Sequence, residues 1–333
     1  MAYRFSVAMC TYNGARFVGG QLESIAAQTR APDELVVCDD RSSDETVSVV
    51  ERFAAEAPFP VRLRVNEQNL GSTKNFERAI SLCAGDLIAL SDQDDVWLTR
   101  KLARLEEEFA RSPEVGLVFS DATVVDDEGR ATGRRLWETV GLGRAERERL
   151  RAGESIGDLL SGSTMTGATM ALRASLRSLA LPFPEDLPFI HDAWIALVVA
   201  CVARVSAVEE PLVLYRRHAA QQVGPLERTA SVGGLGAVAS GETRDALRRE
   251  NPYDATLAVA RAARRRLSEK RVEGFDAQEA LAHLEARIAH LEARRALPHA
   301  RLRRALGVLR ELLTLRYHRY SNGVASAAKD LLS

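Results

Sequence analysis

The chain has 333 residues and a formal net charge of -1, so no overall excess of positive charge favours binding to nucleic acid. Its hydrophobic fraction of 46% and charged fraction of 27% are ordinary for a globular protein, and its length allows two domains or one large domain with an appendage. No signal-peptide pattern precedes the first apolar run, and the longest such run, 193–203, is shorter than the roughly 20 residues that cross a bilayer. We therefore expect a cytoplasmic protein, and peripheral contact with the inner face of the cell membrane is left open.

The four cysteines, Cys10, Cys38, Cys83 and Cys201, lie in or beside apolar runs. No two of them have C-x-x-C spacing, which argues against a zinc site. We expect buried free thiols in a reducing compartment rather than disulfides.

The first 120 residues alternate short apolar runs with segments of helical periodicity. The apolar runs predict strands at 5–10, 35–38, 61–65, 87–90 and 115–120. This alternation predicts a mostly parallel sheet with helices on both faces. Ligands of such sheets bind beyond the carboxyl ends of the strands. The polar loops that follow Cys10, Cys38 and Leu90 are therefore expected to meet at one edge.

The rest of the chain has a less regular pattern. The charged, glycine-containing segment 130–154 predicts a mobile connection or lid, and further strands are expected at 164–172, 205–208 and 211–215. A helix is expected over 194–201, and glycines beyond Val223 indicate a linker. From Ala255 the composition favours helices, with an apolar stripe at Leu281, Leu284, Ile288 and Leu291. This stripe would pack on the body or on a second subunit, so a homodimer through these helices is left open.

An acidic run, Asp92-Gln93-Asp94, directly follows the predicted strand 87–90. Two carboxylates at this spacing can hold Mg²⁺ or Mn²⁺ together with substrate phosphates and water. Such a cation would stabilise a departing diphosphate. The alternative is that the acidic run caps the next helix, where negative charge is favoured anyway.

Two more polar loops lie at the same predicted edge. Asp39-Asp40 can accept hydrogen bonds from a nucleoside, or these residues can simply stabilise a turn. The loop Thr11-Tyr12-Asn13-Gly14 can offer a stacking ring, hydroxyls and backbone amides at a helix N-terminus. Its alternative is a polar connection with no ligand.

His191-Asp192 precedes the apolar helix. Asp192 can act as a general base that His191 orients, or it can simply cap the helix. After the last strand, Arg216 and Arg217 can bind a diphosphate and His218 can ligate a metal, or the three form a solvated basic turn.

The tryptophans Trp97, Trp137 and Trp194 can stack on a sugar ring or pack in the core.

Several motifs occur in order between about Phe5 and Val223. They are Val7–Gly14, Gln21–Ile25 with Gln28-Thr29, Val37–Asp44 with Thr46, Asn69-Leu70-Gly71 with Asn75-Phe76, Ser91–Trp97 with Lys101, Thr166-Gly167, Pro182-Phe183-Pro184, His191–Trp194 and Pro211–His218. Jointly they resemble the family-two inverting glycosyltransferases of the GT-A fold. The resemblance is strongest to rhamnosyltransferase-type members, which act on bacterial surface polysaccharides.

The resemblance implies an α/β fold of GT-A type, with a Rossmann-like sheet over residues 1–223. About 1–120 would form the nucleotide-binding half, 121–223 the acceptor and base half, and 224–333 a mainly helical extension. Asp192 is the predicted catalytic base, and the metal ligands are Asp92, Asp94 and His218. The predicted nucleotide-sugar contacts are Thr11, Tyr12, Asn13, Asp40, Asn75, Asp92, Arg216 and Arg217. The residues predicted to orient the acceptor are His191, Trp194, Thr166 and Gly167.

Two departures from the family pattern stand out. Arg41 occupies a position where the family usually has a small residue, most often glycine, which would change the shape of the second loop. The base motif is His-Asp instead of the commoner Glu-Asp, a variation that rhamnosyltransferase-like members share.

The expected reaction moves a sugar from a nucleotide diphosphate donor to a hydroxyl of a glycan or lipid-linked oligosaccharide. The first expectation for the donor is dTDP-rhamnose and the second is a UDP-hexose, in bacterial surface polysaccharide synthesis. A catalytically inactive nucleotide-sugar-binding relative is an alternative. A sugar nucleotidyltransferase would need a glycine-rich basic loop, which Thr11–Ala15 lacks. A receiver-like signalling module would be complete near residue 120.

Overall fold

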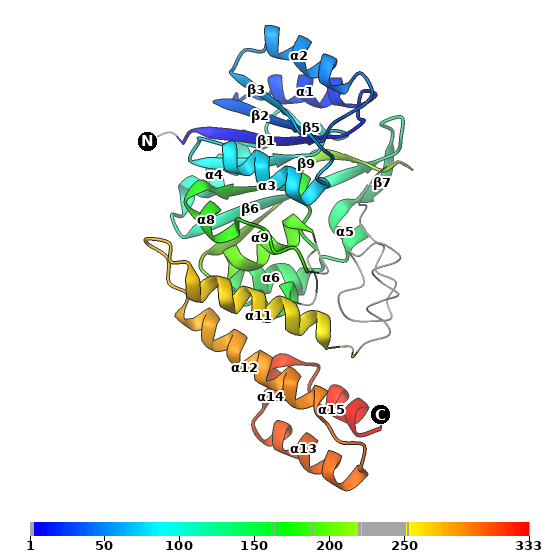
Figure 1. Ribbon diagram of the computed structural model, residues 1–333, viewed down its shortest axis with the longest axis vertical. Helices are drawn as coiled ribbons and strands as arrows, with labels where there is room; N and C mark the ends of the chain where they lie inside the picture. Colours follow the sequence, from blue (N-terminus) through cyan, green and yellow to red (C-terminus); the bar gives the residue numbers. More distant parts are fainter. Residues whose placement is uncertain are drawn as a thin grey trace. The chain divides into compact units, whose positions relative to one another are not determined.

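The computed structural model describes the whole chain except residues 1, 2, 161, 163, 188, 189, 219, 220, 222–250, 252 and 333. The described residues form two compact units (Figure 1). The first unit comprises residues up to 185 and from 190 to 221, and the second comprises 251–332 with residues 186 and 187. The predicted domain boundary after residue 223 falls outside the described residues.

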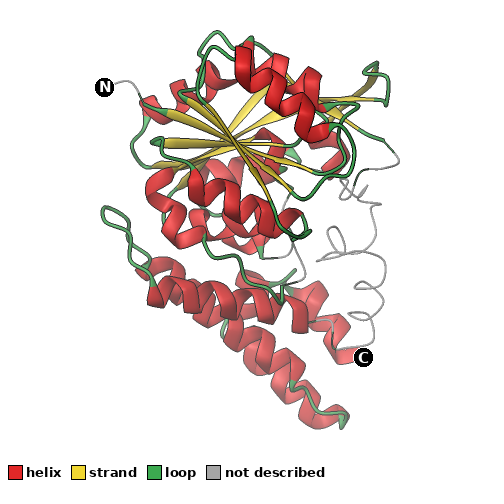
Figure 2. Ribbon diagram, turned by 45° about the horizontal axis from the view of Figure 1, so that its top comes forward, coloured by secondary structure: helices red, strands yellow, loops and turns green. Residues whose placement is uncertain are grey.

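Four parallel strands form the first half of the sheet, in the order β3-β2-β1-β4. They are β1 (Phe5–Thr11), β2 (Glu34–Asp39), β3 (Val61–Val65) and β4 (Leu87–Ser91). Every residue of β1, β2 and β4 is buried, because helices cover both faces of the sheet (Figure 2). The four cysteines are buried free thiols, as predicted.

Helices link these strands at the predicted places. They are α1 (Val18–Ala26), α2 (Thr46–Glu56), α3 (Ser72–Leu82) and α4 (Lys101–Arg111). Each turns its apolar stripe inward, as α4 does with Leu102, Leu105 and Phe109; the charged residues of α4 other than Lys101 lie at least partly exposed. The strand-helix alternation predicted for the first 120 residues is confirmed.

The sheet continues with strands of mixed direction. These are β5 (Val96–Trp97), β6 (Val115–Val125), β7 (Ala131–Arg135), β8 (Met170–Arg173) and β9 (Arg204–Arg216). β8 lies between β4 and β6 and is antiparallel to both, whereas β9 runs parallel to β6. β5 pairs antiparallel with β9, and β7 pairs antiparallel with β6. Among the described residues the sheet has nine strands, of which only β5, β7 and β8 oppose the common direction. The predicted α/β fold with a mostly parallel sheet is confirmed.

Two strand predictions for the second half were wrong in detail, and a third segment is more regular than its composition indicated. The segment 130–154, for which a mobile connection or lid stays a prediction, contains β7, α5 (Leu136–Val140) and α6 (Arg144–Ala152). The two strands expected at 205–208 and 211–215 are one strand, β9, whose register against β6 shifts next to Pro211, a residue without a backbone N–H. The strand expected over 164–172 begins only at Met170, after the 3-10 turn η1 (Gly167–Thr169).

Short helices complete the first unit. They are α7 (Ile156–Leu159), the 3-10 turn η2 (Ala174–Leu176), α8 (Arg177–Ala180) and α9 (His191–Ala200). All but the last residue of α9 are buried, as expected for a helix that is apolar all round. α9 contacts both β6 and β9, so its N-terminal residues are fixed with respect to the sheet.

The second unit is helical, as predicted. Its helices are α11 (Asp254–Glu269), α12 (Gln278–Arg295), α13 (Arg301–Leu313), α14 (Arg316–Tyr320) and α15 (Val324–Leu332). α12 packs along α11, with Leu284 and Leu291 of the predicted stripe buried. In the described part of the chain, no helix is both long and apolar enough to cross a bilayer.

Candidate active site

The first polar loop and the acidic run meet at one edge of the sheet, as predicted. The register pairs Thr11 with Asp39 and Met9 with Ser91, so β1, β2 and β4 end together. The Gln93 amide then fastens the loops to each other. Its Oε1 accepts a hydrogen bond from the Tyr12 N–H at 2.8 Å, and its Nε2 donates to the Tyr12 carbonyl at 3.0 Å.

Gly14 allows this close approach. A Cβ atom at Gly14 would lie 2.1 Å from Gln93 Oε1, so any other residue there would displace the amide. The middle residue of Asp92-Gln93-Asp94 therefore aligns the acidic run with the first loop.

The carboxylates of Asp39 and Asp40 hold the second loop in shape. Asp39 Oδ2 accepts a hydrogen bond from the Thr11 hydroxyl at 2.7 Å. Asp40 accepts from the backbone N–H groups of Leu70 and Gly71, at 2.7 and 2.8 Å, and from the Asn66 amide. Asp39, Asp40 and Thr11 are almost fully buried. Direct contacts of Thr11 and Asp40 with a nucleoside stay predictions.

Asn75 and Asn13 stabilise the same surface. The buried Asn75 amide donates to the Cys38 carbonyl at 2.8 Å and accepts from Asn66 at 2.9 Å. The exposed Asn13 side chain accepts from the Ser43 N–H at 2.8 Å. Among the predicted nucleotide-sugar contacts in the first two loops and at Asn75, Asn13 and the half-buried Tyr12 are those whose side chains remain accessible.

Arg41 has a left-handed backbone conformation, with φ of 65°. Side chains other than glycine adopt this region at a steric cost, which explains why the resembling family usually has glycine here. The second loop keeps the shape that glycine would favour, and the arginine bears the strain.

The acidic run forms a cluster of carboxylates with little compensating charge. Burial, followed by the neighbouring carboxylates of Asp94 and Asp192, raises the pKa of Asp92 to about 7. Burial and the Asp94 and Asp92 charges raise the pKa of Asp95 well above its ordinary range. Asp95 Oδ2 is buried without a hydrogen-bond partner among the described residues. The cluster therefore favours a cation, because an added positive charge would stabilise every ionised member.

Lys101 is the basic side chain buried beside this cluster. Its Nζ donates to the Ala168 carbonyl at 2.6 Å and lies 3.5 Å from the centre of the Trp97 ring. Burial lowers the pKa of Lys101 well below its usual value, and the charges of Asp95 and Asp92 oppose that shift. Lys101 was not among the predicted site residues. A signal existed, because it is four residues before Leu105, on the apolar face of α4.

Asp94 and His218, two of the three predicted metal ligands, lie in direct contact. His218 Nε2 and Asp94 Oδ2 are 2.8 Å apart, and the His218 ring packs 4.8 Å from the Phe17 ring. No group of three or more potential protein ligands gathers around one point in the described part of the chain. Mg²⁺ and Mn²⁺ commonly take their remaining oxygen ligands from phosphates and water. A carboxylate, an imidazole and nearby Asp92 are a donor set that fits such a shared site.

Arg216 holds the acidic run in place. Its backbone N–H donates to Asp95 Oδ1 at 3.0 Å, and its guanidinium donates to the carbonyls of Asp94 and Asp127, each at 2.9 Å. Sequence reasoning missed this supporting role. Contact of Arg216 or of the exposed Arg217 with a diphosphate stays a prediction.

Asp192 lies at the start of α9 with both carboxylate oxygens hydrogen-bonded. Oδ1 accepts from the Ala193 N–H at 2.6 Å, and Oδ2 accepts from the Gly167 N–H at 3.1 Å. Burial raises the pKa of Asp192 to about 6, although these hydrogen bonds oppose the shift. The carboxylate is therefore largely ionised at neutral pH and still basic enough to take a proton.

His191 is a neutral neighbour of the base. Its ring stacks on Phe76 at 4.1 Å, and burial lowers the pKa of His191 to about 3. Its Nδ1 is buried without a hydrogen-bond partner among the described residues. A Cβ atom at Gly167 would lie 3.2 Å from His191 Nε2, so the predicted Thr166-Gly167 motif leaves room for the ring.

One acceptor prediction changes in the structure. The Trp194 ring is buried, and its Nε1 donates to the Ala180 carbonyl at 2.9 Å, so Trp194 packs in the core and offers no face to a sugar. Trp97 and Trp137 are also buried, which supports the core-packing alternative for all three tryptophans. The Thr166 carbonyl accepts from Thr169 and closes the η1 turn that places the Gly167 N–H.

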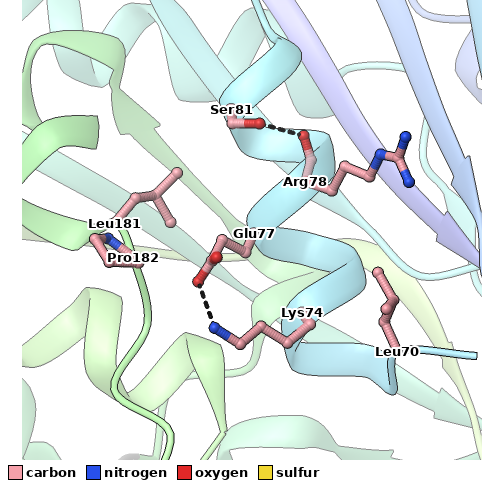
Figure 3. Close-up of a pocket in the computed structure, with 7 residues that line it drawn as sticks. All are labelled: Leu70, Lys74, Glu77, Arg78, Ser81, Leu181 and Pro182. Atoms are coloured by element: carbon pink, nitrogen blue, oxygen red, sulfur yellow. Dashed lines mark hydrogen bonds and ion pairs between the residues drawn. The ribbon is translucent and has the colours of Figure 1, made fainter. Parts of the chain in front are cut away.

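A pocket of about 530 Å³ lies against α3, outside the acidic cluster. It is lined by Leu70, Lys74, Glu77, Arg78, Ser81, Leu181 and Pro182 (Figure 3). None of these is a predicted site residue. Glu77 accepts a hydrogen bond from the Phe183 N–H at 2.6 Å, which fixes the 181–183 segment to the helix that carries Phe76.

Comparison with known proteins agrees with this geometry. Residues 6–177 match the family model for glycosyl transferase family 2. The UDP-Glc:alpha-D-GlcNAc-diphosphoundecaprenol beta-1,3-glucosyltransferase WfgD of Escherichia coli is 35% identical over 100 residues, which cover 30% of this chain and 38% of that protein. The dTDP-rhamnosyl transferase RfbG of Shigella flexneri is 35% identical over 98 residues, covering 28% and 34%.

A solved structure supports the fold. S. aureus TarS 1-349 in complex with UDP superposes with a TM-score of 0.54 at 18% identity, covering 87% of this chain and 71% of that one. The chain spans about two thirds or less of the length of the curated relatives it matches. The family match covers more than half of the sequence and includes the first loop and the acidic run. The chain therefore belongs to glycosyl transferase family 2 and has a GT-A-like fold.

Proposed function

We propose that the protein transfers a sugar with inversion of the anomeric configuration, using Asp192 as general base. The contacts that carry this proposal join Asp192 to the acidic run. Asp192 Oδ2 accepts a hydrogen bond from the Gly167 N–H, and the carbonyl of the next residue, Ala168, accepts one from Lys101, whose side chain neighbours Asp92 and Asp95. These carboxylates come from the end of β4 and the start of α9. One cluster can therefore hold a donor diphosphate on one side and deprotonate an acceptor on the other.

In the proposed step, Asp192 takes the proton of the acceptor hydroxyl as its oxygen bonds to the anomeric carbon. The bond from that carbon to the diphosphate oxygen breaks on the opposite face, and the nucleoside diphosphate leaves. The N–H groups of Gly167 and Ala193 hold both Asp192 oxygens and so fix the orientation of the carboxylate. A positioned base of this kind contributes about 10²–10⁴-fold to the rate.

We propose Mg²⁺ or Mn²⁺ as the cofactor. Asp94 and His218 would hold it, with Asp92 on the same side of the cluster. When bound, such a cation neutralises charge on a leaving diphosphate. Two observations support the proposal: the buried carboxylates outnumber Lys101, and Asp95 Oδ2 has no hydrogen-bond partner in the part of the chain that the structure describes.

The nucleotide would lie on the surface made by the first and second loops. Tyr12 and Asn13 are the proposed contacts, because their side chains are accessible at the sheet edge. Thr11, Asp40 and Asn75 would act mainly by holding these loops in shape, since their polar atoms already bond within the protein.

For the donor we propose dTDP-rhamnose first and a UDP-hexose second. The relatives named for these two donors are equally identical to the chain, so identity does not separate them. The His191-Asp192 motif favours rhamnose, because rhamnosyltransferase-like members resemble the chain there. The acceptor would be a glycan or lipid-linked oligosaccharide of a bacterial surface polysaccharide, made at the cytoplasmic side of the membrane.

A thermal-unfolding screen tests donor and metal together. The protein is heated with dTDP-rhamnose, UDP-glucose or no ligand, each with and without Mn²⁺. A donor at 100 times its Kd should stabilise the fold by about 2.7 kcal/mol. We expect stabilisation by one donor, and only with Mn²⁺. Failure of every nucleotide sugar would refute the proposal.

Turnover is then measured as release of the nucleoside diphosphate in the presence of acceptor glycans. Donor binding without turnover on any of them would instead support a catalytically inactive relative.

A further inference from the structure

Helix α13 of the second unit, labelled in Figure 1, contains four exposed leucines. Leu302, Leu306, Leu309 and Leu313 are 82%, 63%, 51% and 76% exposed. Their spacing of four, three and four residues places them on one face of the helix. A contiguous apolar face of this kind on a surface marks an interaction site.

The opposite face of α13 packs against its own unit, so the leucine row is not the face with which this helix joins the core of that unit. Val308 packs in a small core with Tyr317 and Ala327. Glu311 is buried and contacts His290 Nδ1 at 2.7 Å. The helix therefore presents its leucines outward in a defined orientation.

The charges around the leucine row have one sign. Residues 296–325 contain six arginines and one acidic residue, Glu311, which is buried against His290. The arginines are Arg301, Arg303, Arg304, Arg310, Arg316 and Arg319. By helical spacing, Arg303 and Arg310 lie along one edge of the row. An apolar stripe bordered by arginine is typical of helices that lie in the interface of an anionic membrane.

We propose that α13 docks on an anionic lipid bilayer, with its leucines in the acyl boundary and its arginines among the headgroups. A second copy of the chain fits this face less well. A two-fold contact would place the same arginine-rich face against itself, where like charges repel. A bilayer satisfies both features, because it offers apolar chains beneath negative charge. The proposal is independent of the catalytic assignment.

The test is flotation of the full chain with vesicles of phosphatidylglycerol and phosphatidylcholine, compared with phosphatidylcholine alone. We expect binding to the anionic vesicles that weakens as salt is raised. The double variant Leu306→Ser/Leu309→Ser should lose at least about tenfold in partitioning. Arg303→Glu/Arg310→Glu should lose at least about tenfold as well.

Matched variants control for general effects of composition. Val65→Ser removes an exposed apolar side chain from the first unit, and Arg265→Glu reverses an exposed charge on α11; both should bind as the wild type does. Thermal unfolding should confirm that each variant folds, as expected for substitutions of exposed residues.

Equal binding to neutral and anionic vesicles, or no binding to either, would overturn the proposal. So would leucine variants that bind vesicles normally while converting a dimer into a monomer in sedimentation. That last result would assign the face to a second copy of the chain.

Discussion

The substitution Asp192→Asn tests the proposed base, and the structure indicates that the variant will fold. An amide offers one acceptor oxygen where the carboxylate offers two, so one of the N–H groups of Gly167 and Ala193 would face an NH₂. A buried donor left without an acceptor costs about 1–3 kcal/mol. The substitution also removes a buried charge, which offsets this cost.

The size of that offset follows from the pKa of Asp192. Burial raises it from 3.8 to about 6, a shift of about two units that corresponds to about 3 kcal/mol. Because the folded protein holds this proton more tightly than the unfolded chain, the carboxylate destabilises the fold progressively as pH rises from about 4 to about 6, and fully above that. At pH 8 the two effects of Asp192→Asn nearly cancel, leaving a net change below about 2 kcal/mol.

The rate of sugar transfer should change far more than the stability does. At pH 8 we expect a loss of about 10²–10⁴-fold in Asp192→Asn, with donor binding retained. In the wild type, kcat/KM should rise about tenfold per pH unit below pH 6 and level off above it, since only the ionised carboxylate accepts a proton. The residual rate of the variant should lack this rise.

The assay is release of the nucleoside diphosphate between pH 5 and pH 8, with donor binding followed by thermal stabilisation. Asp158→Asn is the matched control, because this exposed aspartate pairs with Arg149 away from the cluster. Near-wild-type turnover in Asp192→Asn, or an unchanged inflection near pH 6, would remove Asp192 from the role.

Three further predictions concern the acidic cluster and the second loop. A chelator or the substitution Asp94→Asn should reduce the rate of sugar transfer by at least about 100-fold. Added Mn²⁺ should restore the activity of the chelated wild type but not that of the variant. Full activity of the wild type in chelator would exclude a required metal. Binding of Mn²⁺ with donor at pH 7 should release about half a proton, because the pKa of Asp92 is about 7 and a bound cation keeps this carboxylate ionised. Calorimetry in two buffers of different ionisation enthalpy measures the release. An equal heat of binding in both buffers would contradict it. Arg41→Gly should stabilise the fold by about 1 kcal/mol, because glycine relieves the left-handed strain. The control Arg52→Gly, within α2, should destabilise the fold by about 1 kcal/mol. Thermal unfolding measures both changes, and destabilisation by Arg41→Gly as well would show that the loop is unstrained.

The parts of the fold that the sequence predicted are those where burial dictates residue type. β1, β2 and β4 are covered on both faces, so they appear as continuous apolar runs. Helix α6 was missed because Leu150 is its only buried residue, which leaves no apolar stripe to detect. Its start did carry a signal, since Glu146 reaches back to the N–H of Gly143 at 2.6 Å in the spacing of a capping box. β5 is two residues long and forms only because β9 lies beside it.

The site divides in the same way. Asp92, Asp94 and Asp192 are recognisable because each lies where an apolar strand or helix begins or ends. Arg216 is different, since its carbonyl partner at Asp94 is 122 residues away and becomes a partner only after β9 joins the sheet. The tryptophans left two interpretations open, because their residue type suits both a sugar and a core, and only packing decides between them.

Lys101 shows why the acidic cluster tolerates burial without being neutralised. A single buried lysine, held by the Ala168 carbonyl and the Trp97 ring, lies near Asp92 and Asp95. Burial and the neighbouring carboxylates keep the pKa values of Asp92 and Asp95 raised, and burial keeps that of Asp192 raised. A second lysine would have stabilised the fold, but it would also have neutralised carboxylates that would otherwise attract a metal cation. The incomplete compensation keeps the fold intact and leaves the cluster ready to bind a further cation.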